Sequence, residues 1–288
     1  MEVGYMDAGG WIEKALAGRW IAGPTIEDAI GKAKSLNRHH IRAILNYLGE
    51  AYNRKENVDK AVASILELMD AIGNSGVKAD VAVKGTQLGM LLGWGALVGN
   101  YRRIVREGAK RGITVWLDME EHKYVTKTVR LYLLVPRRGR TGICIQSYLK
   151  RSISDMKNVT RHGGMIRLVK GAYTEPESVA FQSREETTGN YYVLMDYLFR
   201  NSKRFTIATH DEAVVRKALE LNKKYGRDVT YAMLNGIRGR LARELAQKGE
   251  KVSVYVPFGR EWIPYSYRRL KEASNLKLVV RSIFERGL

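Results

Sequence analysis

The sequence contains a single cysteine, Cys144, among its 288 residues. One cysteine excludes an intramolecular disulfide framework and any metal site built from several cysteines, and it is typical of a chain kept in a reducing compartment. The histidines do not stand at metal-ligand spacing either, so we expect no bound metal. Acidic residues are also scarce, because 30 Asp and Glu stand against 49 Lys and Arg, which gives a net charge of +19. This excess favours an anionic partner such as nucleic acid, an acidic membrane surface or an anionic ligand, although the basic residues are scattered as on a solvated surface.

Long hydrophobic runs are absent as well. The longest uncharged span, Gly85–Tyr101, contains five glycines and is shorter than a membrane helix usually needs to be. We interpret it as a glycine-rich loop that does not cross a membrane. The segment Met1–Asp7 lacks the basic and apolar regions of a signal peptide. These features predict a cytoplasmic location.

Short apolar runs alternate with helical patterns along most of the chain. Eight of these runs are interpreted as strands: Ile41–Leu48, Ala79–Val83, Ile113–Leu117, Gly142–Ile145, Met165–Val169, Phe205–Thr209, Val229–Leu234 and Val252–Val256. The stretches with helical periodicity are 57–73, which we expect Gly73 to end, and Tyr101–Lys110, Tyr191–Phe199, Glu212–Tyr225 and Ile237–Lys248. Strands this short, alternating with helices, predict a parallel sheet in an α/β protein.

Eight is the number of strands that closes a (βα)8 barrel of the TIM type. An open, doubly wound sheet is the alternative, but no Gly-x-Gly-x-x-Gly opens any of the helices. Residues 1–36 are expected to form an N-terminal helical segment packed on the barrel, with Thr25 and Asp28 as a capping box, and residues 37–288 the barrel itself. A helix over Tyr265–Ser274 follows the last strand.

Polar residues end most of the predicted strands. In a closed barrel the chemistry gathers at the carboxyl ends of the strands, so these residues predict a shared site. They are Lys84, Asp118, Gln146, Lys170, His210 and Tyr255, with Leu234 as the apolar exception.

The residue types indicate an anionic ligand. A buried Asp118 would orient a cation or a substrate amine. His210 would act as an acid, a base or a donor to an anionic cofactor. Arg167 and Lys170, followed by Gly171 where the backbone can approach closely, offer cations to a phosphate or a reduced flavin.

The stretch Val254–Glu272 reads as a strand, a short loop broken at Pro257 and Gly259, and a helix. On that helix Tyr265 lies one turn before Arg268 and Arg269, and Glu272 lies one turn after them. The planar forks of two adjacent guanidiniums suit a carboxylate or a phosphate. A solvated basic helix face is the alternative.

Several motifs appear in the order found in one enzyme family. They are Arg167-Leu-Val-Lys-Gly-Ala-Tyr173, Ala208-Thr-His210, and Tyr255 followed by Tyr265-x-x-Arg-Arg-Leu-x-Glu272, with weaker matches at Leu48-Gly-Glu50, Val83-Lys84, Leu117-Asp-Met-Glu120 and Ile145-Gln-x-Tyr148. From about Trp20 to Leu270 the chain resembles the proline dehydrogenase family, flavoenzymes that oxidise L-proline. The resemblance implies a (βα)8 barrel that holds FAD at its carboxyl end, with the last helix over the barrel mouth.

The resemblance also implies a role for each site residue. Arg268, Arg269 and Lys84 would bind the proline carboxylate, and Tyr255, Tyr265 and Leu234 would enclose the ring. Asp118 would organise the cations, and Leu168 would help to pack the site. The residues implied to contact FAD are Gln146, Arg167, Val169, Lys170, Gly171, Ala172, His210 and Glu272.

The implied reaction passes a hydride from C5 of proline to N5 of FAD and releases Δ1-pyrroline-5-carboxylate. Electrons would then pass to a quinone or an electron-transfer partner, and the basic surface would allow peripheral attachment to an anionic membrane. Two alternatives stay open. One is another (βα)8 enzyme that binds a flavin or a phosphate ligand, and the other, which we favour less, is a basic nucleic-acid-binding protein.

Overall fold

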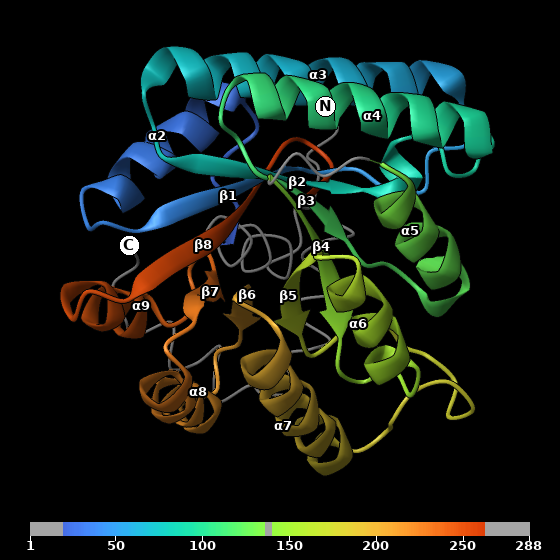
Figure 1. Cartoon of the computed structure of the whole chain (residues 1–288). Helices are drawn as coiled ribbons and strands as arrows, with labels where there is room; N and C mark the ends of the chain where they lie inside the picture. The colour runs from blue at the N-terminus through green and yellow to red at the C-terminus, as the bar shows by residue number, and fades with distance from the viewer. Residues whose placement is uncertain (1–19, 136–139, 263–288) are drawn as a thin grey trace, which may run out of the picture.

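The computed structural model describes residues 20–135 and 140–262, and within them eight parallel strands close into a barrel in sequence order (Figure 1). Strand β1 pairs with β2 on one side and with β8 on the other, where Arg42 lies opposite Ser253. Closure confirms the predicted (βα)8 barrel and rules out the open sheet. The strands are β1 (Arg42–Tyr47), β2 (Ala79–Lys84), β3 (Val115–Asp118), β4 (Thr141–Gln146), β5 (Met165–Val169), β6 (Arg204–Ala208), β7 (Asp228–Leu234) and β8 (Lys251–Phe258).

Helices surround the barrel on the outside (Figure 1). The described residues place one helix before β1 and one between each pair of consecutive strands. The helix before β1, α2, packs on β1 and β8 and begins at the capping box predicted from Thr25 and Asp28. The helices are α2 (Ile26–Asn37), α3 (Lys55–Ser75), α4 (Trp94–Lys110), α5 (His122–Leu134), α6 (Ser152–Arg161), α7 (Arg184–Asn201), α8 (Glu212–Tyr225) and α9 (Gly239–Gln247).

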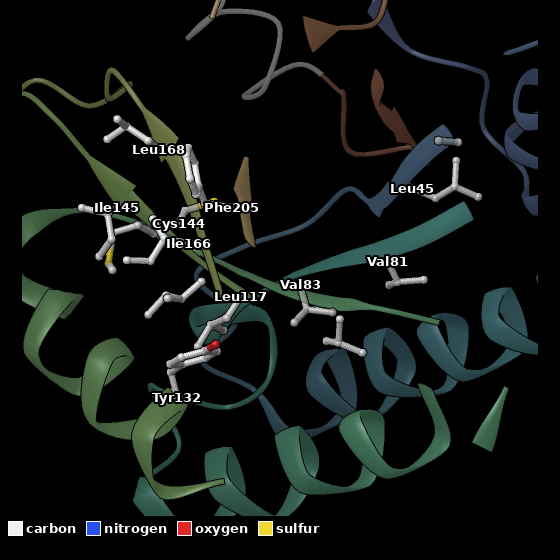
Figure 2. Close-up of a cluster of buried hydrophobic side chains, with 14 of the residues drawn as sticks. Leu45, Val81, Val83, Leu117, Tyr132, Cys144, Ile145, Ile166, Leu168 and Phe205 are labelled. Atoms are coloured by element: carbon white, nitrogen blue, oxygen red, sulfur yellow. The ribbon is translucent and has the colours of Figure 1, made fainter. Parts of the chain in front are cut away.

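The two faces of each strand bury different kinds of side chain, because successive residues of a strand point to opposite sides. Apolar side chains of one face pack between the sheet and the helices. Figure 2 shows the strand residues Leu45, Val83 and Leu117 of this layer, together with Tyr132 of α5. This layer removes most of the apolar surface from water. The other face lines the barrel interior, where a smaller apolar group gathers Ile44, Ala82 and Trp116 with Met165 and Tyr255.

Gly142 makes room for the largest interior side chain. A Cβ at this position would lie 2.3 Å from the indole ring of Trp116 on the neighbouring strand. The indole therefore lies across β4, beneath the carboxyl end of the barrel, where it supports the groups above it.

Three sequence predictions need correction. Gly73 does not end α3, which continues to Ser75 and ends at Gly76 in the left-handed conformation (φ 69°). Strand β8 does not break at Pro257, whose carbonyl accepts a hydrogen bond from the backbone N–H of Ala22 at 2.9 Å.

The third correction concerns Gly85–Tyr101, which is only partly a loop. A short 3₁₀ turn, η1 (Gly85–Gln87), is followed by tight turns, and α4 already begins at Trp94. No helix among the described residues has the length and apolar character needed to cross a membrane. The predicted helix over Tyr265–Ser274 and the first nineteen residues lie outside the described residues.

Candidate active site

The site residues that the structure describes gather toward the carboxyl end of the barrel, although Tyr255 does not end its strand, because β8 continues to Phe258. Lys84 and Asp118 are the last residues of β2 and β3 and lie opposite each other in register. Leu234, the last residue of β7, lies opposite Tyr255 of β8. Other described residues of the predicted site also stand at this end: Gln146 closes β4, Val169 closes β5, Lys170, Gly171 and Ala172 follow β5, and His210 follows β6.

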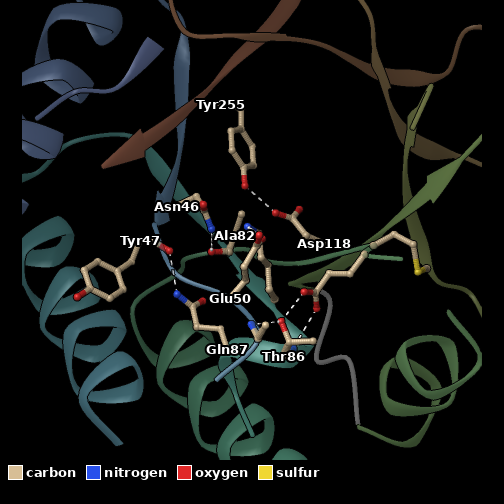
Figure 3. Close-up of polar contacts among 12 residues, drawn as sticks. Asn46, Tyr47, Glu50, Ala82, Thr86, Gln87, Asp118 and Tyr255 are labelled. Atoms are coloured by element: carbon tan, nitrogen blue, oxygen red, sulfur yellow. Dashed lines mark hydrogen bonds and ion pairs between the residues drawn. The ribbon is translucent and has the colours of Figure 1, made fainter. Parts of the chain in front are cut away.

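A buried ion pair connects β3 with β5, across the strand β4 that lies between them. The guanidinium of Arg167, only 4% exposed, donates from Nη2 to Oδ1 of Asp118. The other carboxylate oxygen, Oδ2, accepts a hydrogen bond of 2.6 Å from the hydroxyl of Tyr255 (Figure 3). The carboxylate of Asp118 therefore fixes a cation from β5 and a phenol ring from β8 at the same time.

Aromatic rings enclose the same guanidinium. Its Cζ lies 5.0 Å from the centroid of the Trp116 ring and 5.3 Å from that of Tyr255, within the range of cation–π attraction. The sulfur of Cys144 completes its surroundings by accepting a hydrogen bond of 3.0 Å from Nε. Burial raises the pKa of the Cys144 thiol to about 12, so this sulfur is protonated at neutral pH.

A second buried cation, Lys84, lies at the end of β2. Its Nζ donates to Oε2 of Glu50, on the loop after β1, at 2.7 Å. Glu120 is also close to Lys84, and its Oε1 accepts a 3.0 Å hydrogen bond from the backbone N–H of Thr86. Burial raises the pKa of Glu120 despite the opposing charge of Lys84. The strand end thus keeps a positive charge next to two carboxyl groups.

The ends of β5 and β6 form another group. Lys170 donates to the hydroxyl of Thr188 at 3.1 Å and lies 3.7 Å from Asp211, and burial lowers its pKa. The Nε2 atom of His210 accepts from the backbone N–H of Leu234 at 3.0 Å, so the neutral ring carries its proton on Nδ1.

Gly171 takes φ = +123°, and a Cβ there would lie 2.2 Å from the ring of Tyr148. Only glycine fits this position, where the ring of Tyr148 packs against the backbone that follows β5.

Several buried polar atoms at this end make no hydrogen bond to any described residue. Besides Nη1 of Arg167 and Oε1 of Gln146 they include Oδ1 of Asn46 and Nε1 of Trp116, while Nε2 of Gln146 donates to the Met119 carbonyl at 3.3 Å. Buried polar atoms in folded proteins are almost always paired. An unpaired donor and an unpaired acceptor therefore indicate a ligand that supplies the complementary groups.

Sequence reasoning gave no site role to four residues that the structure brings into contact with the cluster: Glu50, Trp116, Glu120 and Cys144. Glu50 and Glu120 stand in two of the motifs quoted above, and their place just after strand ends was the available signal. Cys144 and Trp116 lie inside strands and carry no comparable signal. Tyr265, Arg268, Arg269 and Glu272 lie outside the described residues, so their roles stay predictions.

These features define an enzyme of the (βα)8 class, with buried, charge-compensated groups at the carboxyl ends of its strands. The chain belongs to the proline dehydrogenase family, because the model of that family, described as proline dehydrogenase, matches residues 29–281.

Known proteins agree with this assignment. The chain is 33% identical over 280 residues to a proline dehydrogenase of Deinococcus radiodurans, which covers 94% of this chain and 90% of the relative. It is 28% identical to proline dehydrogenase 1 of Bacillus subtilis, with 94% and 91% covered.

Solved structures share the fold. The crystal structure of proline utilization A from Bdellovibrio bacteriovorus, inactivated by N-propargylglycine, superposes with a TM-score of 0.84 at 23% identity. The match covers 92% of this chain but 34% of the solved one, so the chain spans about a third of that larger protein.

Proposed function

We propose that this chain oxidises L-proline to Δ1-pyrroline-5-carboxylate with FAD as its cofactor. The observation that carries the proposal is the match of the proline dehydrogenase model to almost the whole barrel, residues 29–281. The Arg167–Asp118–Tyr255 cluster supports it, because a buried cation and an oriented phenol at the strand ends suit an anionic cofactor and a small substrate.

The residues present fit a flavin. Nη1 of Arg167 offers a donor and Oε1 of Gln146 an acceptor, both buried and without a partner among the described residues. Gly171 lets the ring of Tyr148 pack directly against the backbone that follows β5. A flavin carries carbonyl acceptors and an N–H donor, which complement these two atoms. The proposed cofactor contacts are Gln146, Arg167, Val169, Lys170, Gly171, Ala172, His210 and Glu272.

The proposed substrate site lies against the same cluster. Lys84, Arg268 and Arg269 would bind the proline carboxylate, since cations suit it and guanidiniums match its geometry. The ring of Tyr255, fixed by its hydrogen bond to Asp118, would form one wall of the site. Leu234 lies opposite Tyr255 in register and would form another, together with Tyr265.

The protein's part in the reaction is placement. The chemistry that a flavin supplies when bound is two-electron oxidation of the bond between C5 and nitrogen. Arg167 would hold a positive charge where negative charge develops, and the apolar walls would keep water away from the reacting carbon.

The reduced enzyme must pass its electrons on, and we propose a quinone or an electron-transfer protein as the acceptor. A cytoplasmic protein with a net charge of +19 would bind an anionic membrane surface peripherally. Co-sedimentation with vesicles that contain anionic lipid, and not with neutral vesicles, would support this part. Equal binding to both would exclude it.

The test of the proposed reaction is a visible spectrum of the purified, flavin-loaded protein before and after addition of proline under anaerobic conditions. We expect proline to bleach the flavin absorbance and to drive reduction of an added dye. The variant Arg268→Ala should lose roughly 2–5 kcal/mol of substrate binding, which raises KM more than tenfold.

A matched control is Arg42→Met at the opposite end of the barrel, whose side chain is 39% exposed and paired with Asp80. It should leave the KM for proline unchanged. A flavin-loaded protein that proline does not reduce would instead favour a different (βα)8 flavoenzyme.

A further inference from the structure

Cys144 occupies the position between the two charged partners of the buried ion pair. It lies in β4, between Asp118 of β3 and Arg167 of β5, and it is the register partner of Arg167. Its sulfur accepts from Nε of Arg167 at 3.0 Å and donates to Oδ1 of Asp118 at 3.4 Å. Only 4% of the residue is exposed.

We infer that Cys144 is a positioning residue for the proposed reaction, one that fixes the rotation of the Arg167 guanidinium so that Nη1 is directed to the cofactor. The inference rests on the proposed function, because the group that Nη1 would meet is the flavin. Cys144 itself acts through Arg167 and would touch neither substrate nor cofactor.

The ion pair alone does not fix the guanidinium. A bidentate pair, with two parallel hydrogen bonds, would hold the fork rigidly. Here only Nη2 donates to Asp118, whose second oxygen is taken by Tyr255. The rings of Trp116 and Tyr255 attract the cation at 5.0 and 5.3 Å, but this attraction does not select one rotation within the guanidinium plane.

The hydrogen bond from Nε to the sulfur is therefore the second anchor of the fork. Nε and Nη2 are both held, so the position of Nη1 follows from the planar geometry of the guanidinium. The same atom is a buried donor that lacks a partner among the described residues. The hydrogen bonds from Nε to Cys144 and from Nη2 to Asp118 therefore set the direction in which Nη1 points.

A neutral thiol suits this place better than a second acid. The carboxylate of Asp118 already balances the charge of Arg167, and another anion would cancel the positive charge that a reduced flavin needs. Because burial keeps the proton on sulfur, the thiol can accept from Arg167 and donate to Asp118 without changing the net charge.

The first test is the infrared S–H stretch of the protein, with and without flavin. Cys144 is the only cysteine in the chain, so the band belongs to it alone. We expect a band at lower frequency in the folded protein than in the chain unfolded by urea, since the thiol donates to a carboxylate. An unshifted band would overturn the inference, and this reading does not depend on proline oxidation.

The second test compares Cys144→Ser, which keeps both hydrogen bonds, with Cys144→Val, which fills the space without them. In Cys144→Val the ratio of reduced to oxidised flavin at a fixed potential should fall about tenfold, the scale of one hydrogen bond. For a two-electron couple this lowers the midpoint potential by about 30 mV. Cys144→Ser should stay near the parent value.

The control is Ile145→Val, the adjacent residue of β4, which is 1% exposed and packs in the apolar layer outside the barrel. It should lower the stability but leave the flavin potential unchanged. An unchanged potential in Cys144→Val would refute the positioning role while proline oxidation stood. Failure of the parent protein to bind flavin or oxidise proline would refute the proposed function, whatever the S–H band shows.

Discussion

Removing the carboxylate of Asp118 should destabilise the protein strongly, because it leaves a buried cation without its counter-charge. Arg167 is 4% exposed, and Asp118 is the carboxylate that the structure pairs with it. Breaking a buried ion pair from one side typically costs about 3–5 kcal/mol. For a chain of this size, where each kcal/mol shifts Tm by about 2–4 °C, Asp118→Ala should lower Tm by roughly 6–20 °C.

The double variant Asp118→Ala/Arg167→Met decides whether the unpaired charge is the cause. Replacing both partners of a buried pair by apolar groups is often neutral or stabilising, because no ion stays buried alone. We therefore expect the double variant to be more stable than Asp118→Ala alone, although it removes more of the native contacts.

Thermal unfolding followed by circular dichroism measures the difference, in protein freed of flavin so that cofactor loss does not contribute. The comparison is Asp196→Ala, which breaks the exposed pair with Arg200 and should cost less than about 1 kcal/mol. If the Tm of the double variant is equal to or below that of Asp118→Ala, the unpaired charge of Arg167 is not the cause of the lost stability.

Other predictions concern single positions. Burial raises the pKa of Glu120, so between its ordinary value near 4.3 and its folded value the folded state binds more protons than the unfolded chain, and stability falls as pH rises. The variant Glu120→Gln cannot lose this proton, so its free energy of unfolding in urea, relative to that of the parent, should increase as pH rises. A difference in free energy of unfolding that stays constant with pH would contradict the raised pKa of Glu120. Gly171→Ala, which forces a Cβ against Tyr148 at φ = +123°, should cost roughly 1–3 kcal/mol and weaken flavin retention, measured as flavin released on dialysis; full retention and stability would show that the backbone has other room. Lys84→Met should raise the KM for proline more than tenfold, whereas the exposed Lys55→Met should not, and equal kinetics in both would remove Lys84 from the site.

The sequence predicted the barrel well because strand burial leaves a strong signal. Every predicted strand has a counterpart in the structure, and the helix over Glu212–Tyr225 has the predicted bounds. Local errors arose where one residue was given too much weight. A single glycine inside a helix costs only about 1 kcal/mol, so the packing of α3 carries it past Gly73.

Helix α6 was not predicted, because the side of it that is buried mixes polar and apolar residues. In α6 the buried positions are Ser152, Asp155, Met156 and Val159, of which only two are apolar. With Met156 and Val159 as its only buried apolar residues, the helix offers a short apolar pattern. One of its buried polar residues, Asp155, forms an ion pair with Arg151.

The sequence could assign the side chains of the site to one rim of the barrel, but it could not show which of them form hydrogen bonds or ion pairs with one another. Strand ends in a barrel converge whatever their side chains, so Lys84, Asp118 and Gln146 could be assigned to one rim. Which groups bond depends on distances across the closed barrel. The bond from Tyr255 to Asp118 joins residues 137 positions apart, and no local pattern encodes it.

Arg167 shows how a residue that disturbs the pattern can identify the architecture. It interrupts the apolar run of β5, and in an open sheet covered by helices on both faces such a charge would lie in an apolar layer without a partner. In a closed barrel the same alternation turns it inward, where residues of β3, β4 and β8 surround it. The guanidinium is stable there because three other strands supply a carboxylate, a thiol and a ring. A charged residue in the middle of a buried strand therefore favours the barrel over the open sheet, and it also marks the strand beneath the site.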